Sequence, residues 1–151
     1  MVVGMNNWSH KNSTGKPPPR QFLPVLERLK GVYLSWCQFY QILPKTHRYS
    51  LGLKIDNLFI EAIESITVAT FLPKESKLPF VRLAIRKMDT LKVLLMVLWE
   101  AKSLEEKKYV AILLPIDEVG RMLGGWYEQL AKAPDQARNK QNSPAIKTRE
   151  K

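Results

Sequence analysis

The sequence predicts an all-α protein, an antiparallel up-down four-helix bundle. Apolar residues recur at helical spacing in four successive segments. Prolines mark the ends of these segments, and no segment shows the alternation of apolar and polar residues that is typical of a half-buried strand. Four helices of about 20 residues with short connections pack most simply as a bundle in which successive helices run in opposite directions.

The first two expected helices cover residues 22–43 and about 49–72. The apolar stripe of the first comprises Phe22, Leu26, Leu29, Tyr33, Trp36, Tyr40 and Leu43. That of the second comprises Ile55, Leu58, Ala62, Ile66 and Ala69. Pro44 and Pro73 follow the two stripes, and we expect each proline to end its helix because it lacks an N–H group.

The third expected helix covers about 78–101, with Pro79 in its first turn, where a missing N–H costs little. Its stripe comprises Val81, Ala84, Met88, Leu91, Leu95 and Leu98. The fourth begins at Ser103, which with Glu106 fits a capping box. Its stripe comprises Tyr109, Ile112, Ile116, Val119, Leu123, Trp126 and Leu130. Pro115 lies inside this helix and is expected to kink or split it.

The two ends of the chain carry most of its positive charge. Residues 1–20 contribute +3 and residues 131–151 contribute +4 to a total of +10. Both ends are rich in polar residues and proline, so we expect a disordered basic arm over 1–20, a bundle domain over 21–130 and a disordered basic tail over 131–151. A basic surface on the domain, which itself carries +3, requires local clustering of charges.

The residues that catalysis would require are missing, so we expect a protein that is not an enzyme and holds no metal or cofactor. The single cysteine, Cys37, excludes an internal disulfide and a cysteine-based zinc site. Both histidines, His10 and His47, fall outside helix interiors, whereas a di-metal bundle needs Glu-x-x-His pairs. No phosphate-binding loop or serine or cysteine nucleophile with a histidine partner is evident. Because no apolar run reaches the length of a signal peptide or bilayer span, we expect a cytoplasmic protein with no membrane contact.

Two clusters of basic residues remain within the expected domain. Lys45, Arg48 and Lys54 lie in and after the first connection, near His47. Lys74, Lys77, Arg82, Arg86, Lys87 and Lys92 form the second cluster, opposed by Glu75 and Asp89. An ordinary solvated surface would explain such runs, but the basic arms favour electrostatic, salt-sensitive contact with nucleic acid.

The run "DEVGRMLGGWYEQL" places three glycines in the fourth helix, at a cost of about 1 kcal/mol each relative to alanine. We expect another backbone to approach there closely, with the ring of Trp126 beside it. A frayed helix end is the alternative. The apolar stripes are wide, and Phe39, Phe59 and Trp99 lie on their flanks. A monomer would leave some of these rings exposed, which predicts self-association.

The runs "LPKTHRYSLG", "LKVLLMVLW" and "EVGRMLGGW" resemble the accessory variability determinant (Avd) family of diversity-generating retroelements. The fold is also similar to that of four-helix proteins encoded in intervening sequences of bacterial ribosomal RNA genes. The resemblance covers roughly residues 22–130. Residues that match the family's basic first turn, the basic position on its third helix and its fourth-helix signature are Pro44, Lys45, Arg48, Lys92, Gly120, Arg121, Leu123, Gly124 and Trp126.

The resemblance implies a non-catalytic accessory protein that forms a ring-like homopentamer. It implies binding to a reverse transcriptase and to nucleic acid, which is RNA, DNA or an RNA–DNA hybrid, in support of mutagenic retrohoming. Arg121 then contacts nucleic acid or polymerase, or it pairs with Asp117 on its own helix. The alternatives are an intervening-sequence-type bundle of unknown function and a purely structural oligomerisation module.

Overall fold

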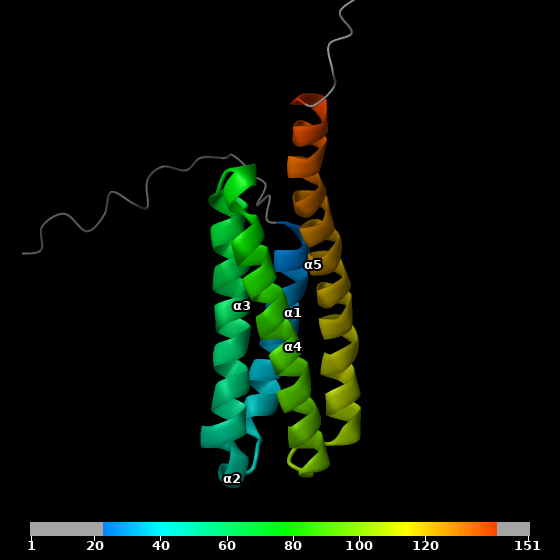
Figure 1. Cartoon of the computed structure of the whole chain (residues 1–151). Coiled ribbons are helices and arrows are strands. Elements are labelled where there is room, and N and C mark those ends of the chain that lie inside the picture. Colours follow the sequence, from blue (N-terminus) through cyan, green and yellow to red (C-terminus); the bar gives the residue numbers. More distant parts are fainter. Residues whose placement is uncertain (1–22, 142–151) are drawn as a thin grey trace, which may run out of the picture.

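The computed structural model describes residues 23–141, with side chains described for 23–132. Within this part of the chain, four long helices lie side by side (Figure 1). They are α1 (Pro24–Gln41), α3 (Leu53–Phe71), α4 (Leu78–Glu100) and α5 (Glu106–Gln141). Short helical turns, α2 (Lys45–His47), η1 (Arg48–Gly52) and η2 (Lys74–Ser76), connect them. The prediction of an all-α fold with four helices is confirmed.

The connections lie at the two ends of the bundle. The junction of α1 with α3 and the junction of α4 with α5 are at the same end, and the α3–α4 junction is at the other (Figure 1). Each of the pairs α1–α3, α3–α4, α4–α5 and α5–α1 is in contact. The α4–α5 side of the bundle therefore lies opposite the α1–α3 side.

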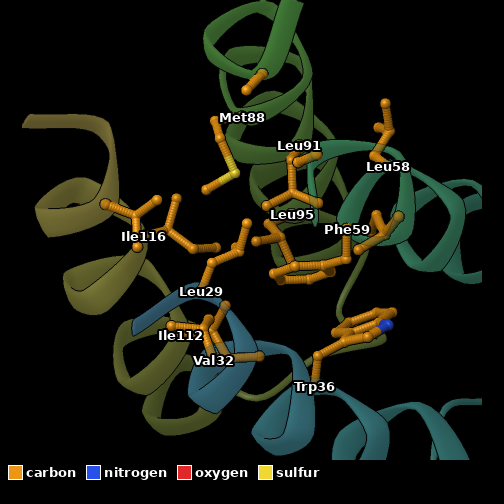
Figure 2. Packing of buried hydrophobic residues seen from close by; sticks show 14 of the residues in the cluster. Leu29, Val32, Trp36, Leu58, Phe59, Met88, Leu91, Leu95, Ile112 and Ile116 are labelled. Carbon is orange, nitrogen blue, oxygen red and sulfur yellow. The ribbon is translucent and has the colours of Figure 1, made fainter. Parts of the chain in front are cut away.

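The core forms from the predicted apolar stripes. All six stripe residues of α4 and all five of α3 are buried, and Ile112, Ile116, Val119 and Leu123 of α5 are fully buried. In Figure 2 the rings of Trp36 and Phe59 lie beside Leu91, Leu95 and Leu29 in the centre of this packing. The two rings stack with centroids 6.1 Å apart. Spacing alone therefore identified the inward face of each helix.

The flanking rings are less exposed than the sequence suggested. Phe59 is fully buried, and Phe39 and Trp99 are half-buried. The ring of Trp99 stacks on Tyr109 at 5.0 Å, and Phe39 packs against the core. The exposed apolar surface consists instead largely of aliphatic side chains on the outer faces of the helices.

Helical structure resumes directly after Pro44, four residues earlier than expected. The turn η1 is π-helical, and it leads from α2 into α3 without a break. Gly52 ends this turn in a crowded position, where an added Cβ would lie 2.9 Å from Leu43 Cδ1 and 3.1 Å from the His47 carbonyl oxygen. A larger residue would have to displace both neighbours, so the widened turn favours glycine at this position.

The start of the last helix differs from the predicted capping box. α5 begins at Glu106, and the Glu105 carbonyl accepts the hydrogen bond of the Tyr109 N–H at 2.9 Å. The Ser103 side chain cannot cap the helix from three residues outside it. Its hydroxyl is hydrogen-bonded instead to Nδ1 of His47.

Helix α5 runs unbroken through Pro115, so of the two predicted effects, a kink or a split, the split does not occur. Pro115 removes one N–H partner, that of the Ala111 carbonyl, and Ala111 is exposed, so water can satisfy that oxygen. The helix also continues to Gln141, which differs from the disordered tail expected from residue 131. The expected arm over 1–20 and the remainder of the tail lie outside the described residues.

Candidate nucleic-acid interface

The structure separates the eight basic residues that the sequence proposed as a binding site. Four of them, Arg48, Arg82, Lys87 and Lys92, have partners within the chain. The side chains of the other four have no hydrogen bond or ion pair to the residues described here: Lys45, Lys54, Arg86 and Arg121. These four do not form one surface, because two lie near the α2 end of the bundle and two on α4 and α5.

Arg48 holds the end of α1. Its Nη2 donates hydrogen bonds to the carbonyl oxygens of Leu43 at 2.8 Å and Gln41 at 3.1 Å, and its Nε donates to Leu43 at 3.2 Å. Gln41 is the last residue of α1 and Leu43 follows it, at a helix end where a positive charge is favourable and acceptors lack helical partners. The family's basic first turn therefore contains a structural arginine as well as an exposed lysine.

A second lysine-bearing turn lies beside this one. The hydrogen bond between His47 and Ser103 joins the α2 turn to the α4–α5 connection, which contains Lys102. Lys102 is exposed, and its backbone is left-handed with φ of 61°. Lys45, Lys54 and Lys102, here called the bundle-end lysines, thus lie toward one end of the molecule (Figure 1).

The sequence did not single out Lys102. It lies between Glu100 and two further glutamates, Glu105 and Glu106, so its segment appears neutral in the sequence. Lys108 forms an ion pair with one of these carboxylates, and its Nζ lies 3.9 Å from Glu105 Oε2. Only the contact between two distant connections shows that Lys102 and Lys45 occupy the same end.

Arg82 is held by an aromatic side chain of α5. Its Nη2 donates a hydrogen bond to the Tyr127 hydroxyl at 2.8 Å, and its guanidinium lies 5.5 Å from the centroid of the same ring. This combined contact links the first turns of α4 to α5. Arg82 remains exposed, so it stabilises the bundle and still presents charge to solvent.

Lys87 and Lys92 are paired with carboxylates. Lys87 Nζ lies 2.9 Å from Glu61 Oε2 of α3, an ionic contact in which that oxygen accepts no well-angled hydrogen bond. Lys92 Nζ lies between Asp89, at 3.6 Å, and Asp117, at 3.7 Å. Both lysines are largely covered and neutralised, which makes them poor ligands for phosphate.

Arg121 projects from the outer face of α5 and does not pair with Asp117, whose carboxylate contacts Lys92 instead. The expected ion pair on α5 is therefore absent among the described residues. Arg121 borders a groove of about 340 Å³ between α4 and α5 and one of about 580 Å³ between α1 and α5. An unpaired arginine between two grooves is suited to an external partner.

The fourth-helix signature divides into core residues and open glycines. Leu123 is fully buried, and Trp126 packs against both buried clusters, which supports its expected packing role. A Cβ at Gly120, Gly124 or Gly125 would have no neighbour within 4 Å. The close approach expected there is not made within the described chain, and the frayed end is excluded because α5 continues past these residues.

The described residues offer no metal site, since no group of three or more His, Cys, Asp or Glu side chains comes together among them. Burial raises the pKa of Tyr33 well above its usual value, and the neighbouring Cys37 and Asp56 add to this effect. That trio joins α1 to the first turn of α3, the turn that also contains Lys54. Over the same residues, no helix is long and apolar enough to cross a bilayer.

Comparison with known proteins finds no relative of this chain. No protein-family model, curated protein sequence or solved structure matches the chain. The four-helix class of the fold rests on the structure itself, and any functional assignment rests on the residues described above.

Proposed function

We propose that this chain is a non-catalytic accessory protein of a diversity-generating retroelement, which binds nucleic acid and a reverse transcriptase. The observation that carries the nucleic-acid part is the set of bundle-end lysines, which are exposed and have no partner in the described chain. The polymerase part rests on the sequence resemblance. We also propose the antiparallel up-down topology and the ring-like homopentamer that this family implies, in a cytoplasmic setting.

Binding through these lysines would be electrostatic. Each of the three exposed ammonium groups can displace a counterion from a phosphate. An ammonium group lacks the paired donors with which arginine forms two hydrogen bonds to the edge of a base. Glu100 and Glu106 lie on the same end of the bundle and reduce its net positive charge. We therefore expect weak sequence preference and a strong dependence of affinity on salt.

The test is a titration of full-length protein with a structured RNA at low and at moderate salt. The wild type should bind at low salt and lose affinity as salt rises. The variant Lys45→Glu/Lys54→Glu should bind at least tenfold more weakly. The matched control is Lys74→Glu/Lys132→Glu, which changes net charge equally with exposed lysines elsewhere. Equal loss in both variants would show that only net charge matters, and no wild-type binding at low salt would refute the nucleic-acid role.

The accessory role needs a separate test. If a reverse transcriptase is encoded beside this gene, the two proteins should co-purify when produced together. The second candidate function is a structural oligomerisation module, and the pairing of Arg48, Arg82, Lys87 and Lys92 within the chain favours it. That candidate predicts self-association with neither RNA binding nor polymerase binding.

A further inference from the structure

Exposed aliphatic side chains gather on the α4–α5 side of the bundle. Val93 and Met96 of α4 are 52% and 39% exposed, and Val110 of α5 is 42% exposed. Two contacts between the helices bracket these residues. The rings of Trp99 and Tyr109 stack at 5.0 Å on one flank, and Lys92 contacts Asp117 at 3.7 Å on the other. The three side chains, here called the α4–α5 apolar patch, therefore lie at the same height on adjacent helices.

The groove beyond the patch has a gap in its α5 wall at Gly120, between Asp117 and Arg121. Gly120 lines it together with Ile85 and Met88, and Gly124 lies one turn further on the same face of α5. Each glycine weakens the helix relative to alanine, and the described chain makes no use of the space it leaves. A surface from outside the chain can approach the α5 backbone here.

Charges of both signs surround this groove. Arg86 and Arg121 have no partner in the described chain, while Asp89 and Asp117 expose 67% and 49% of their side chains. Lys92 contacts both carboxylates, so the groove carries closely spaced charges of both signs and not the uniform positive charge that phosphates favour. A surface that carries both signs at close spacing can instead pair with another copy of the same protein, because each sign finds its opposite.

The size of this side is also sufficient. α4 has 23 residues. A helix of that length is roughly 35 Å long, and two neighbouring helices together are roughly 20 Å wide, which gives a side of roughly 700 Å². A stable protein–protein interface covers roughly 600–1,000 Å² on each partner. The α4–α5 side is thus large enough for a specific contact between two folded proteins.

We infer that a second copy of this chain docks on the α4–α5 side, with the apolar patch at the centre of the contact and Gly120 and Gly124 allowing close approach. This inference deepens the proposed assembly by naming one of its contact surfaces, and it does not depend on nucleic-acid binding. It removes exposed aliphatic area, gives Arg86 and Arg121 partners, and accounts for the open glycines.

The first experiment measures the mass of the full chain in solution by light scattering over a range of concentrations. The wild type should be larger than a monomer, and Val93→Glu/Val110→Glu should be monomeric with unchanged helical content. The control is Val68→Glu/Leu83→Glu, whose side chains are 41% and 40% exposed and lie on α3 and α4. A monomeric wild type, or a test variant that keeps the wild-type mass, would overturn the inference.

The second experiment replaces the glycines by alanine. The substitutions should stabilise the monomer and weaken its association, so the two measurements should change in opposite directions. Gly120→Ala/Gly124→Ala should raise the Tm of the monomeric protein, made monomeric with Val93→Glu/Val110→Glu, and should weaken association of otherwise wild-type chains at least tenfold. Gly125→Ala is the control, because Gly125 lines a groove toward α1 and should affect only the Tm. Unchanged association in the double alanine variant would contradict the close approach.

Failure of this inference is distinguishable from failure of the proposed function. If the test variants keep the wild-type mass while the bundle-end lysines still bind RNA, the docking surface is wrong and the function stands. If the test variants dissociate while the wild type binds no RNA, the surface is right and the nucleic-acid role fails.

Discussion

Arg48 binds the backbone of Leu43, five residues before it, through two guanidinium nitrogens at 2.8 and 3.2 Å. The contact closes the connection between α1 and α2 over Pro44, which has no N–H group with which to continue a hydrogen-bond ladder. The positive charge of Arg48 thus stabilises the C-terminal end of α1, whereas the nearby Lys45 is exposed to solvent.

Arg48→Ala should lower the free energy of unfolding by about 1–2 kcal/mol, since it removes charge-assisted hydrogen bonds to two carbonyls at a partly exposed site. Lys45→Ala should leave stability unchanged within about 0.5 kcal/mol. Urea unfolding followed by circular dichroism measures both values. If the two variants were equally stable, Arg48 would belong with Lys45 as a surface residue.

Gly52→Ala should be the most damaging of the glycine substitutions. The new methyl group would meet Leu43 Cδ1 at 2.9 Å and the rigid carbonyl of His47 at 3.1 Å. Such crowding typically costs about 1–3 kcal/mol. Gly31→Ala, at an open helical position on α1, should instead stabilise by about 0.5–1 kcal/mol. Thermal melts of the two variants should therefore shift in opposite directions.

Lys102→Gly should separate stability from binding. Lys102 is the non-glycine residue with a left-handed backbone in the described chain, a conformation that costs about 1 kcal/mol and that glycine adopts freely. The substitution should raise the melting temperature and, by removing one bundle-end lysine, weaken RNA binding and its salt dependence. Stronger or unchanged RNA binding in a stabilised variant would remove Lys102 from the proposed interface.

Trp126→Ala should destabilise the monomer by about 3 kcal/mol, because this ring joins the main buried cluster to the smaller one formed by Ala69, Val81 and Leu130. Denaturant midpoints measure the loss. Trp99→Ala is the comparison for the loss of a tryptophan ring elsewhere, because the Trp99 ring stacks on Tyr109 near the opposite end of α4. A Trp126 variant that melts like the wild type would refute its packing role.

Stability should fall as the pH rises above 10, and Tyr33 should contribute to the fall. Its pKa in the folded protein lies above the ordinary value of 10.0, chiefly through burial. The unfolded chain therefore releases the proton first, and alkaline pH favours unfolding. Tyr33→Phe should flatten the dependence of stability on pH above about pH 10. An equal slope in the variant would show that other groups dominate.

The sequence was a good guide to the helices and a poorer guide to the site. The inward residues of each helix follow from a 3.6-residue period, which is local information, and all six predicted in α4 are buried. The helix start after Pro44 was missed because α2 has only three residues, none of them apolar. The capping box at Ser103 failed because α5 begins three residues later, and the Ser103 hydroxyl is hydrogen-bonded to a distant residue, His47.

The basic residues could not be sorted from the sequence because their partners are distant in it. Arg82 and Tyr127 are 45 residues apart, and Lys92 reaches Asp117 on another helix. Charge counting treats a lysine between two aspartates and a lysine in open solvent alike. Their environments differ only after the helices pack.

The short connection between α3 and α4 has a consequence for how the chain reaches its structure. Lys77 donates hydrogen bonds from Nζ to the carbonyls of Ala69 and Thr70, so the end of α3 is bound across the turn η2. Little chain entropy is lost in closing so short a loop, and the two helices can pair before α1 and α5 arrive. Conservative substitutions at the α3–α4 contact, such as Ile66→Val, should mainly slow folding. Ile112→Val in α5 should mainly speed unfolding in stopped-flow experiments.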